Sequence, residues 1–291
     1  MKPLIEFEHP VSAQMGCPGL PLTRRDAFKD ILKHHYGTLL KLGISLLAFS
    51  LPFFIVFSIC NLNYDALYVQ YQAGEISQTA FLEGTLSFYL FELLGFAASL
   101  LLLSFPLSFF SRIFRSICFY DGFFFWNEGK KGFKQNFPHC FFGLLLLALL
   151  SFGSSLLVLF VDFGTGNANW FTSVLAFLPL VATLLLLFPT CLLSYALNSI
   201  YQASFFKGLS NAFKIYLNSF FPTLGLSLSF FLPILVLLIP NSLVAGGLLA
   251  ALIVVYYPVL LLGSWLYFLS RFDKLINEGN YPSLYQKGLF I

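Results

Sequence analysis

Long apolar runs separated by short polar segments dominate the pattern of this chain. Six runs have the length of about 20 residues that an α-helix needs to cross a bilayer. They cover residues 37–60, 86–112, 139–162, 170–198, 216–239 and 243–270. The period-two alternation of a transmembrane β-barrel is absent from the sequence. The pattern therefore predicts an all-α polytopic membrane protein with six transmembrane helices.

Composition supports this class. The chain is 58% hydrophobic and 10% charged, whereas soluble domains carry about 25% charged residues. All 16 Lys and Arg lie in or beside four segments, which precede the first span, join the second to the third, join the fourth to the fifth, and follow the sixth. The other connections, at 61–84, 162–170 and 240–242, have none. Because basic residues stay on the cytoplasmic side, we predict a cell-membrane protein with both termini cytoplasmic.

This topology predicts three parts. Residues 1–23 form an irregular cytoplasmic segment, residues 24–271 the six-helix transmembrane domain, and residues 272–291 a cytoplasmic tail. The second outer connection and the third are short, so we expect antiparallel hairpins there. We expect a short outer helix within 61–84, the longest outer connection.

A phrase recurs before every second span. Phe-Lys dipeptides occur at 28–29, 133–134 and 213–214. The second span of each two-span unit carries an aromatic-proline dipeptide, which ends at Pro106, Pro189 or Pro258. Proline inside a helix bends it. The recurrence predicts three pseudo-repeated hairpins, each preceded by a cytoplasmic amphipathic helix; with 38 Phe in the chain, chance is the alternative. In the first such helix, Thr23 and Asp26 resemble a capping box.

The predicted amphipathic helices present a set of lysines toward the cytoplasmic surface. These side chains are candidate contacts either for anionic lipid of the bilayer or for a protein partner. They are Lys29, Lys130, Lys131, Lys134, Lys207 and Lys214.

Glu92 is the candidate polar site inside the membrane. Ionisable residues at that depth are functional candidates by default, so Glu92 is either a proton-coupling or substrate site or a carboxyl that bonds a neighbouring helix. Asp121, in the second inner connection, is expected to pair with Arg112 or Arg115 as a structural link.

Catalytic and metal-binding patterns are missing from the sequence. Four His and five Cys show no metal-ligand spacing, and no phosphate-binding loop or nucleophile elbow occurs. We therefore expect no enzyme activity, no cofactor and no metal site. The basic residues are spread rather than massed, so nucleic-acid binding is not expected either.

Residues 105–150, beginning FPLSFFSRIFRSICFYDGFFFWNEG, resemble the YesL-like integral membrane proteins of Gram-positive bacteria. The family's phrase before a span matches here at Trp126 to Phe137, with Phe133, Lys134 and Asn136 in place. Residues 206–226 and 272–290 look like its second inner helix and its tail. The membrane domain fused to glycerophosphodiester phosphodiesterases is the second-best match.

The resemblance implies a function only indirectly, because genes of the family often neighbour those of carbohydrate ABC importers. It implies an accessory or regulatory partner of such an import system, in contact with ABC transporter subunits. The alternative is a small-solute transporter or channel, with a path lined by Glu92 and the kinks at Pro106, Pro189 and Pro258.

Overall fold

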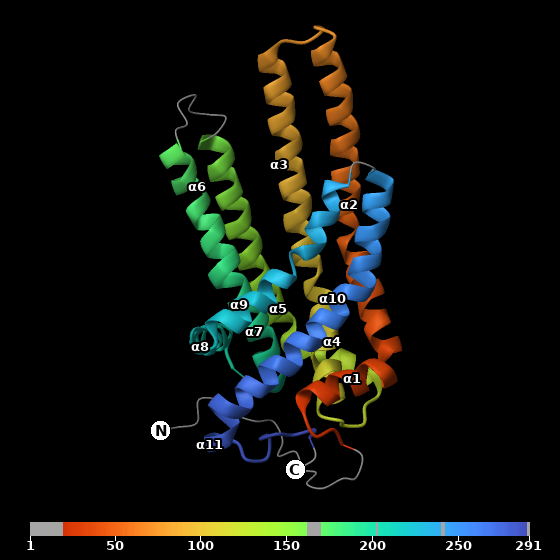
Figure 1. Ribbon diagram of the computed structural model, residues 1–291, viewed down its shortest axis with the longest axis vertical. Helices are drawn as coiled ribbons and strands as arrows, with labels where there is room; N and C mark the ends of the chain where they lie inside the picture. The colour runs from red at the N-terminus through yellow and green to blue at the C-terminus, as the bar shows by residue number, and fades with distance from the viewer. Residues whose placement is uncertain (1–19, 162–169, 202, 240–241, 290–291) are drawn as a thin grey trace. The chain divides into compact units, whose positions relative to one another are not determined.

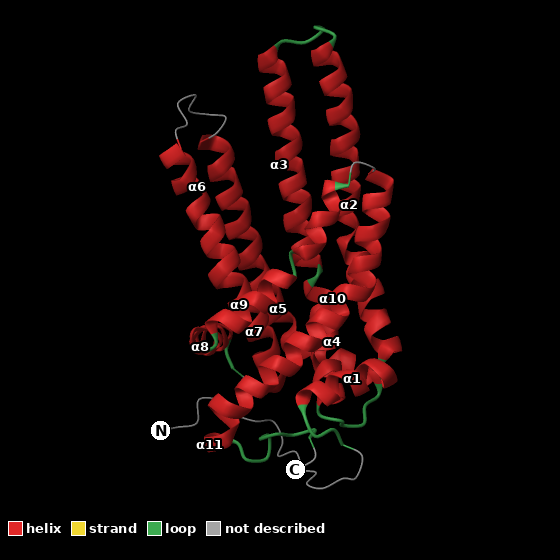
Figure 2. Ribbon diagram, in the orientation of Figure 1, coloured by secondary structure: helices red, strands yellow, loops and turns green. Residues whose placement is uncertain are grey.

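The described part of the protein is helical throughout. The structure is a computed structural model that describes residues 20–161, 170–201, 203–239 and 242–289, and within them no strand occurs (Figure 2). Five helices are long and apolar enough to cross a membrane, and a sixth span arises if one sharply bent pair counts as a single crossing. The predicted fold class is thus confirmed as all-α with five to six candidate spans.

The helices follow one another with few long connections (Figure 1). The α-helices are α1 (Arg24–His34), α2 (Tyr36–Gln72), α3 (Gln78–Leu102), α4 (Ser104–Cys118), α5 (Phe125–Leu159), α6 (Trp170–Ala182), α7 (Phe188–Ile200), α8 (Phe205–Asn218), α9 (Phe220–Ser229), α10 (Ser242–Phe272) and α11 (Glu278–Asn280). The described residues also contain the π-helical turns η2 (Thr183–Leu187) and η4 (Asp273–Asn277) and the 3₁₀ helix η3 (Leu232–Leu238).

The chain divides into two compact units. The first unit comprises Met1–Leu47, Phe105–Phe142 and Phe188–Ile291, and the second comprises Ala48–Ser104 and Gly143–Leu187. Among the described residues, every Lys and Arg belongs to the first unit, while the second carries only acidic charges. The basic segments that the sequence assigns to one side therefore also pack together in one compact body.

In the second unit, the middle of α2 packs closely on α3. A Cβ added at Gly95 would lie 3.0 Å from the Cβ of Val56, and the backbone N–H of Phe53 donates to Ser99 Oγ at 2.9 Å. The separate outer helix predicted within 61–84 is wrong. α2 continues to Gln72 and α3 begins at Gln78, because the polar residues there continue the helix even though they are too polar for the bilayer core.

The first unit is centred on three helices that share buried aromatic side chains. Trp265 of α10 stacks on Phe114 of α4 at 5.5 Å between ring centroids and meets Tyr195 of α7 edge-on at 5.0 Å. The hydroxyl of Tyr195 donates to the carbonyl of Leu107 at 2.7 Å. α1 packs on α10, where Phe28 lies 3.7 Å from a Cβ added at Gly263. These contacts fix the ends of α1, α4, α7 and α10 in one core.

Two of the three predicted amphipathic helices exist as separate elements. α1 begins as expected, because Thr23 Oγ1 accepts from the backbone N–H of Asp26 at 3.1 Å. α8 is separated from α9 by Ser219 alone. The basic segment 127–137 is not a separate helix: it forms the first turns of the continuous α5. Its Glu, Lys and Gln favour a helix, and nothing in it ends one before the apolar run.

The backbone conformation differs among the three prolines at which the sequence predicts kinks. α3 gives way to α4 at Leu103, just before Pro106, and the π-helical η2 ends just before Phe188 and Pro189. Each ring crowds the turn that precedes it, which accounts for the irregularity there. Pro258, by contrast, lies within the uninterrupted α10.

The fifth predicted span is discontinuous. α9 ends at Ser229 and the chain continues as the 3₁₀ helix η3, so carbonyls at the junction lose their helical partners. Two tyrosines of α10 replace them: Tyr256 donates to the Ser229 carbonyl at 2.8 Å and Tyr257 to the Phe230 carbonyl at 3.0 Å. Since backbone polar groups must be satisfied within a bilayer, these hydroxyls make the break tolerable.

Candidate functional site

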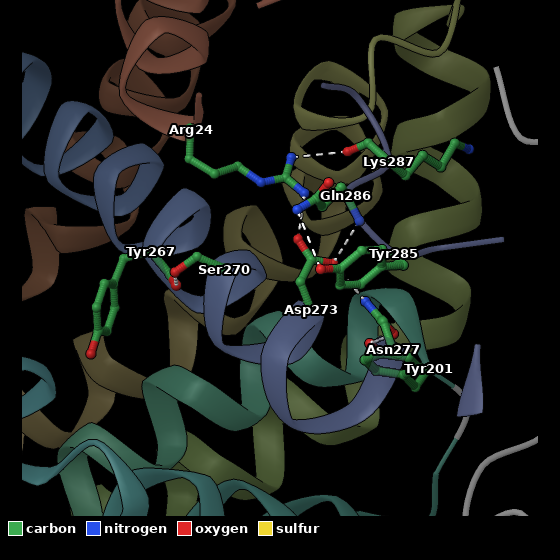
Figure 3. Close-up of polar contacts among 9 residues, drawn as sticks. All are labelled: Arg24, Tyr201, Tyr267, Ser270, Asp273, Asn277, Tyr285, Gln286 and Lys287. Carbon is green, nitrogen blue, oxygen red and sulfur yellow. Dashed lines mark hydrogen bonds and ion pairs between the residues drawn. The ribbon is translucent and has the colours of Figure 1, made fainter. Parts of the chain in front are cut away.

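A buried polar cluster in the first unit is built around the carboxylate of Asp273 (Figure 3). The π-helical turn η4 continues α10 and places Asp273 and Asn277 one turn apart. Arg24, the first residue of α1, reaches the cluster and pairs with Asp273 at 2.8 Å from Nη2 to Oδ2. The two side chains are only 11% and 9% exposed. An ion pair therefore joins the start of α1 to the end of α10.

The second oxygen of Asp273 is also occupied. Oδ1 accepts from Asn277 Nδ2 at 2.9 Å and from the backbone N–H of Gln286 at 3.2 Å. The Asn277 side-chain oxygen accepts from the Tyr201 hydroxyl at 2.6 Å. Burial, reinforced by the charge of Asp273, raises the pKa of Tyr201 well above its usual range, so this phenol is a donor at neutral pH. The carboxylate thus ties α1, α10, the end of α7 and the tail together.

Residues 281–289, which we call the C-terminal strap, are held by this cluster. Arg24 Nη1 donates to the Lys287 carbonyl at 2.9 Å, while the Lys287 side chain points away from Arg24 (Figure 3). That side chain is 3% exposed, pairs with Asp121 at 3.0 Å and lies 5.0 Å from the ring centroid of Phe119. Burial lowers the pKa of Lys287, and the hydrogen bond that Lys287 donates to Asp121 opposes that shift. Asp121 therefore pairs with the strap, and Arg112, one of the two partners that the sequence suggested for it, pairs with Glu128 instead.

The backbone conformation at Gly288 allows the strap to lie close to α4. Gly288 has φ +82°, and a Cβ added there would lie 2.5 Å from the Cys118 carbonyl oxygen. Leu284 supplies an apolar anchor that is 2% exposed. The strap thus lies directly against the end of α4.

A second polar cluster locks α4 to the start of α5. Arg112 donates to Glu128 at 3.0 Å and to Gln135 at 2.6 Å, and Asn136 donates to Ser111 at 2.7 Å. Gly132 permits close approach, because a Cβ there would lie 2.9 Å from the Ser108 carbonyl oxygen. The same turns of α5 carry lysines on the opposite face.

All six candidate lysines are exposed in the structure. Three lie on the first turns of α5, two lie on α8, and Lys29 lies on α1. Of these, Lys131 also pairs with Glu128 at 2.8 Å. The structure thus distributes the candidate contacts over three different helices.

Glu92 belongs to the second unit, whereas both polar clusters belong to the first. It is half-buried on α3 in the second unit, within electrostatic range of Cys60 on α2. Pro106, Pro189 and Pro258 belong to the first unit. Glu92 and these prolines therefore fall in different compact units.

Sequence reasoning missed the Asp273 cluster. A signal was present in the spacing of Asp273 and Asn277, which puts two polar side chains on one face just beyond an apolar run. Their partners Arg24 and Lys287 come from opposite ends of the chain, and no local pattern indicates such a pairing. Each charge in the cluster is paired with an opposite charge, and the pairs hold the helices and the strap together.

Comparison with known proteins assigns no family: no protein-family profile, no curated protein and no solved structure matches this chain. The resemblance to the YesL-like proteins therefore stays a prediction from the sequence.

Proposed function

We propose that this chain is a six-span membrane protein with both termini in the cytoplasm, and that it serves as an accessory or regulatory partner of a carbohydrate ABC import system. Three pseudo-repeated hairpins remain part of this proposal, although the second lacks a separate amphipathic helix. The positive-inside distribution supports the sidedness, and the family resemblance supports the link to carbohydrate import.

One observation favours binding of a protein partner over transport. The first turns of α5, which carry the lysines, are packed firmly against α4. Lys130, Lys131 and Lys134 are exposed on one face of these turns. The opposite face is locked on α4 through Gly132 and Asn136. A preorganised charged face loses little entropy when an acidic surface binds it, so this face suits a protein partner.

Reversal of the three charges tests the proposal. The full chain carrying Lys130→Glu, Lys131→Glu and Lys134→Glu should lose ABC transporter subunits that co-purify with the native chain from its own membranes. A matched control reverses three other exposed charges, Arg25, Lys33 and Lys274, and should keep them. The proposal fails if the native chain recovers no transporter subunit, or if both triple variants lose them equally.

A small-solute transporter is the second candidate, and the broken span favours it. Discontinuous helices near the middle of the membrane form many transport sites, and the α9–η3 junction is such a break. Glu92, in the second unit, is the candidate proton-coupling carboxyl of this alternative. Uptake by proteoliposomes that disappears with Glu92→Gln supports this candidate, and uptake equal to that of empty liposomes excludes it for the solute tested.

A further inference from the structure

α8 presents three distinct faces, of which one is buried. Gly208, Ala212, Ile215 and Tyr216 lie on the side that packs against α7. Gly208 comes so close to α7 that an added Cβ would lie 2.6 Å from Asn198 Oδ1. This face fixes the rotation of α8 about its own axis, and so determines which residues point outward.

The second face is apolar and exposed. Phe206, Phe213 and Leu217 are 80%, 39% and 54% exposed. At about 100° per residue they fall within about 40° of one direction. Large apolar side chains at such exposure in a regular stripe mark a surface that something apolar covers.

The third face is cationic. Lys207 and Lys214 are exposed and lie about a quarter turn from the apolar stripe, on the side away from α7. The sequence of α8, FFKGLSNAFKIYLN, contains no acidic residue. The outward surface of α8 is therefore apolar along one edge, and along the next it carries two lysines and no acidic side chain.

The direction of α8 explains this division. α8 is bent by 107° from the segment that follows it, Phe220–Val236, across the single residue Ser219, and Figure 1 shows it nearly end-on beside α9. In the proposed six-span topology the segment after Ser219 crosses the bilayer, so a helix almost perpendicular to that segment lies close to the membrane plane. Such a helix has one face toward the bundle, one toward acyl chains and one toward headgroups.

We propose that α8 is an interfacial helix that binds anionic phospholipid. Phe206, Phe213 and Leu217 enter the boundary between acyl chains and headgroups, and Lys207 and Lys214 pair with headgroup phosphates. This goes beyond the proposed function, because it assigns these two lysines to the bilayer and leaves partner docking to α5.

α1 supplies the contrast within the same protein. Its exposed positions are all polar, among them Arg25, Lys29 and Lys33, and none of its residues is a large exposed hydrophobic. It is positively charged like α8 but lacks the apolar stripe. α1 therefore provides a matched control with equal charge and no means of insertion.

Lipid selectivity tests the proposal. The full chain would be placed in bilayers of phosphatidylcholine with spin-labelled phosphatidylglycerol or spin-labelled phosphatidylcholine as the probe. Lys207→Gln with Lys214→Gln should lower the preference for phosphatidylglycerol by about fivefold to thirtyfold, while Lys29→Gln with Lys33→Gln should leave it unchanged. Equal effects of the two pairs, or no preference in the native chain, would overturn the assignment. Displacement of phosphatidylglycerol by millimolar inorganic phosphate would also overturn it, in favour of a simple anion site.

Depth measurements test the apolar face separately. A nitroxide attached at Phe206→Cys in a chain without its native cysteines should relax with dissolved oxygen and be shielded from a water-soluble nickel chelate. The same label at Lys33→Cys should show the opposite response. Equal access of the nickel chelate to both labels would contradict insertion of α8. Neither experiment alters the lysines of α5, so failure here leaves the docking proposal intact.

Discussion

The backbone of Gly43 in α2 lies directly on the carbonyl oxygen of Val254 in α10. That carbonyl is the one deprived of a helical donor by Pro258, four residues further on, because proline has no N–H. The proline and the glycine therefore act together: one frees a carbonyl inside the first unit, and the other lets a second helix cover it.

Substitution of Gly43 tests this packing. Gly43→Ala would place a methyl group against the backbone of Val254, so α2 must shift, and we expect a loss of about 1–3 kcal/mol in unfolding free energy. Gly37→Ala in the same helix is the control. Nothing lies within 4 Å of a Cβ there, so it should be neutral or stabilise by up to about 1 kcal/mol through helix propensity. Denaturation in detergent compares the two; similar effects of both would contradict the close approach.

Removal of the Asp273 carboxylate should be the most damaging polar substitution. Asp273→Ala leaves the Arg24 guanidinium buried without its counter-ion, which costs about 3–5 kcal/mol for a buried pair. Lys131→Gln breaks a pair in which Lys131 is 60% exposed and should change the unfolding free energy by less than about 1 kcal/mol. Thermal unfolding of both variants measures the difference. A mild effect of Asp273→Ala would mean that water reaches the cluster.

The strap should detach when Gly288 gains a side chain. Gly288→Ala combines an unfavourable positive φ with a contact against Cys118, and strain of this kind costs about 1–3 kcal/mol. Limited proteolysis should then cleave the chain near its C-terminal end faster than in the native protein. Gly279→Ala, where a Cβ meets nothing within 4 Å, should leave the cleavage rate unchanged. Equal resistance of both variants would show that the strap does not need this glycine.

The two tyrosine hydroxyls that cap the broken span should make small, additive contributions to the unfolding free energy. Tyr256→Phe and Tyr257→Phe each remove one hydrogen bond to the α9–η3 junction, at about 0.5–1.5 kcal/mol apiece. Tyr89→Phe is the control. Tyr89 of α3 is 47% exposed, and loss of its hydroxyl should not change the unfolding free energy. Unfolding in detergent gives the values. If the double variant is as stable as the native chain, the junction is satisfied in another way.

Features encoded locally were predictable from the sequence. Hydropathy predicted every region that the structure shows as a candidate span, and Thr23 with Asp26 marked the start of α1. Spans follow from the hydropathy of a segment, and a helix start follows from hydrogen bonds between residues close in sequence. Both properties are visible in the local sequence.

Features that depend on distant partners were not predictable. The close approach of Gly132 in α5 to the Ser108 carbonyl of α4 joins residues 24 positions apart. The junction after Ser229 is stabilised by tyrosines 27 residues away, and Lys287 finds Asp121 across 166 residues. The sequence places such residues on a segment, but only packing decides which groups meet.

Sidedness is the central claim, and cysteine labelling in intact cells tests it most directly. Single cysteines would replace Glu75, Lys131 and Lys207, all exposed positions, in a chain without its native cysteines. With a membrane-impermeant maleimide, we predict that Glu75→Cys reacts in intact cells and that Lys131→Cys and Lys207→Cys react only after permeabilisation. Labelling of either lysine position from outside would contradict the topology and, with it, both the docking face of α5 and the lipid contacts of α8.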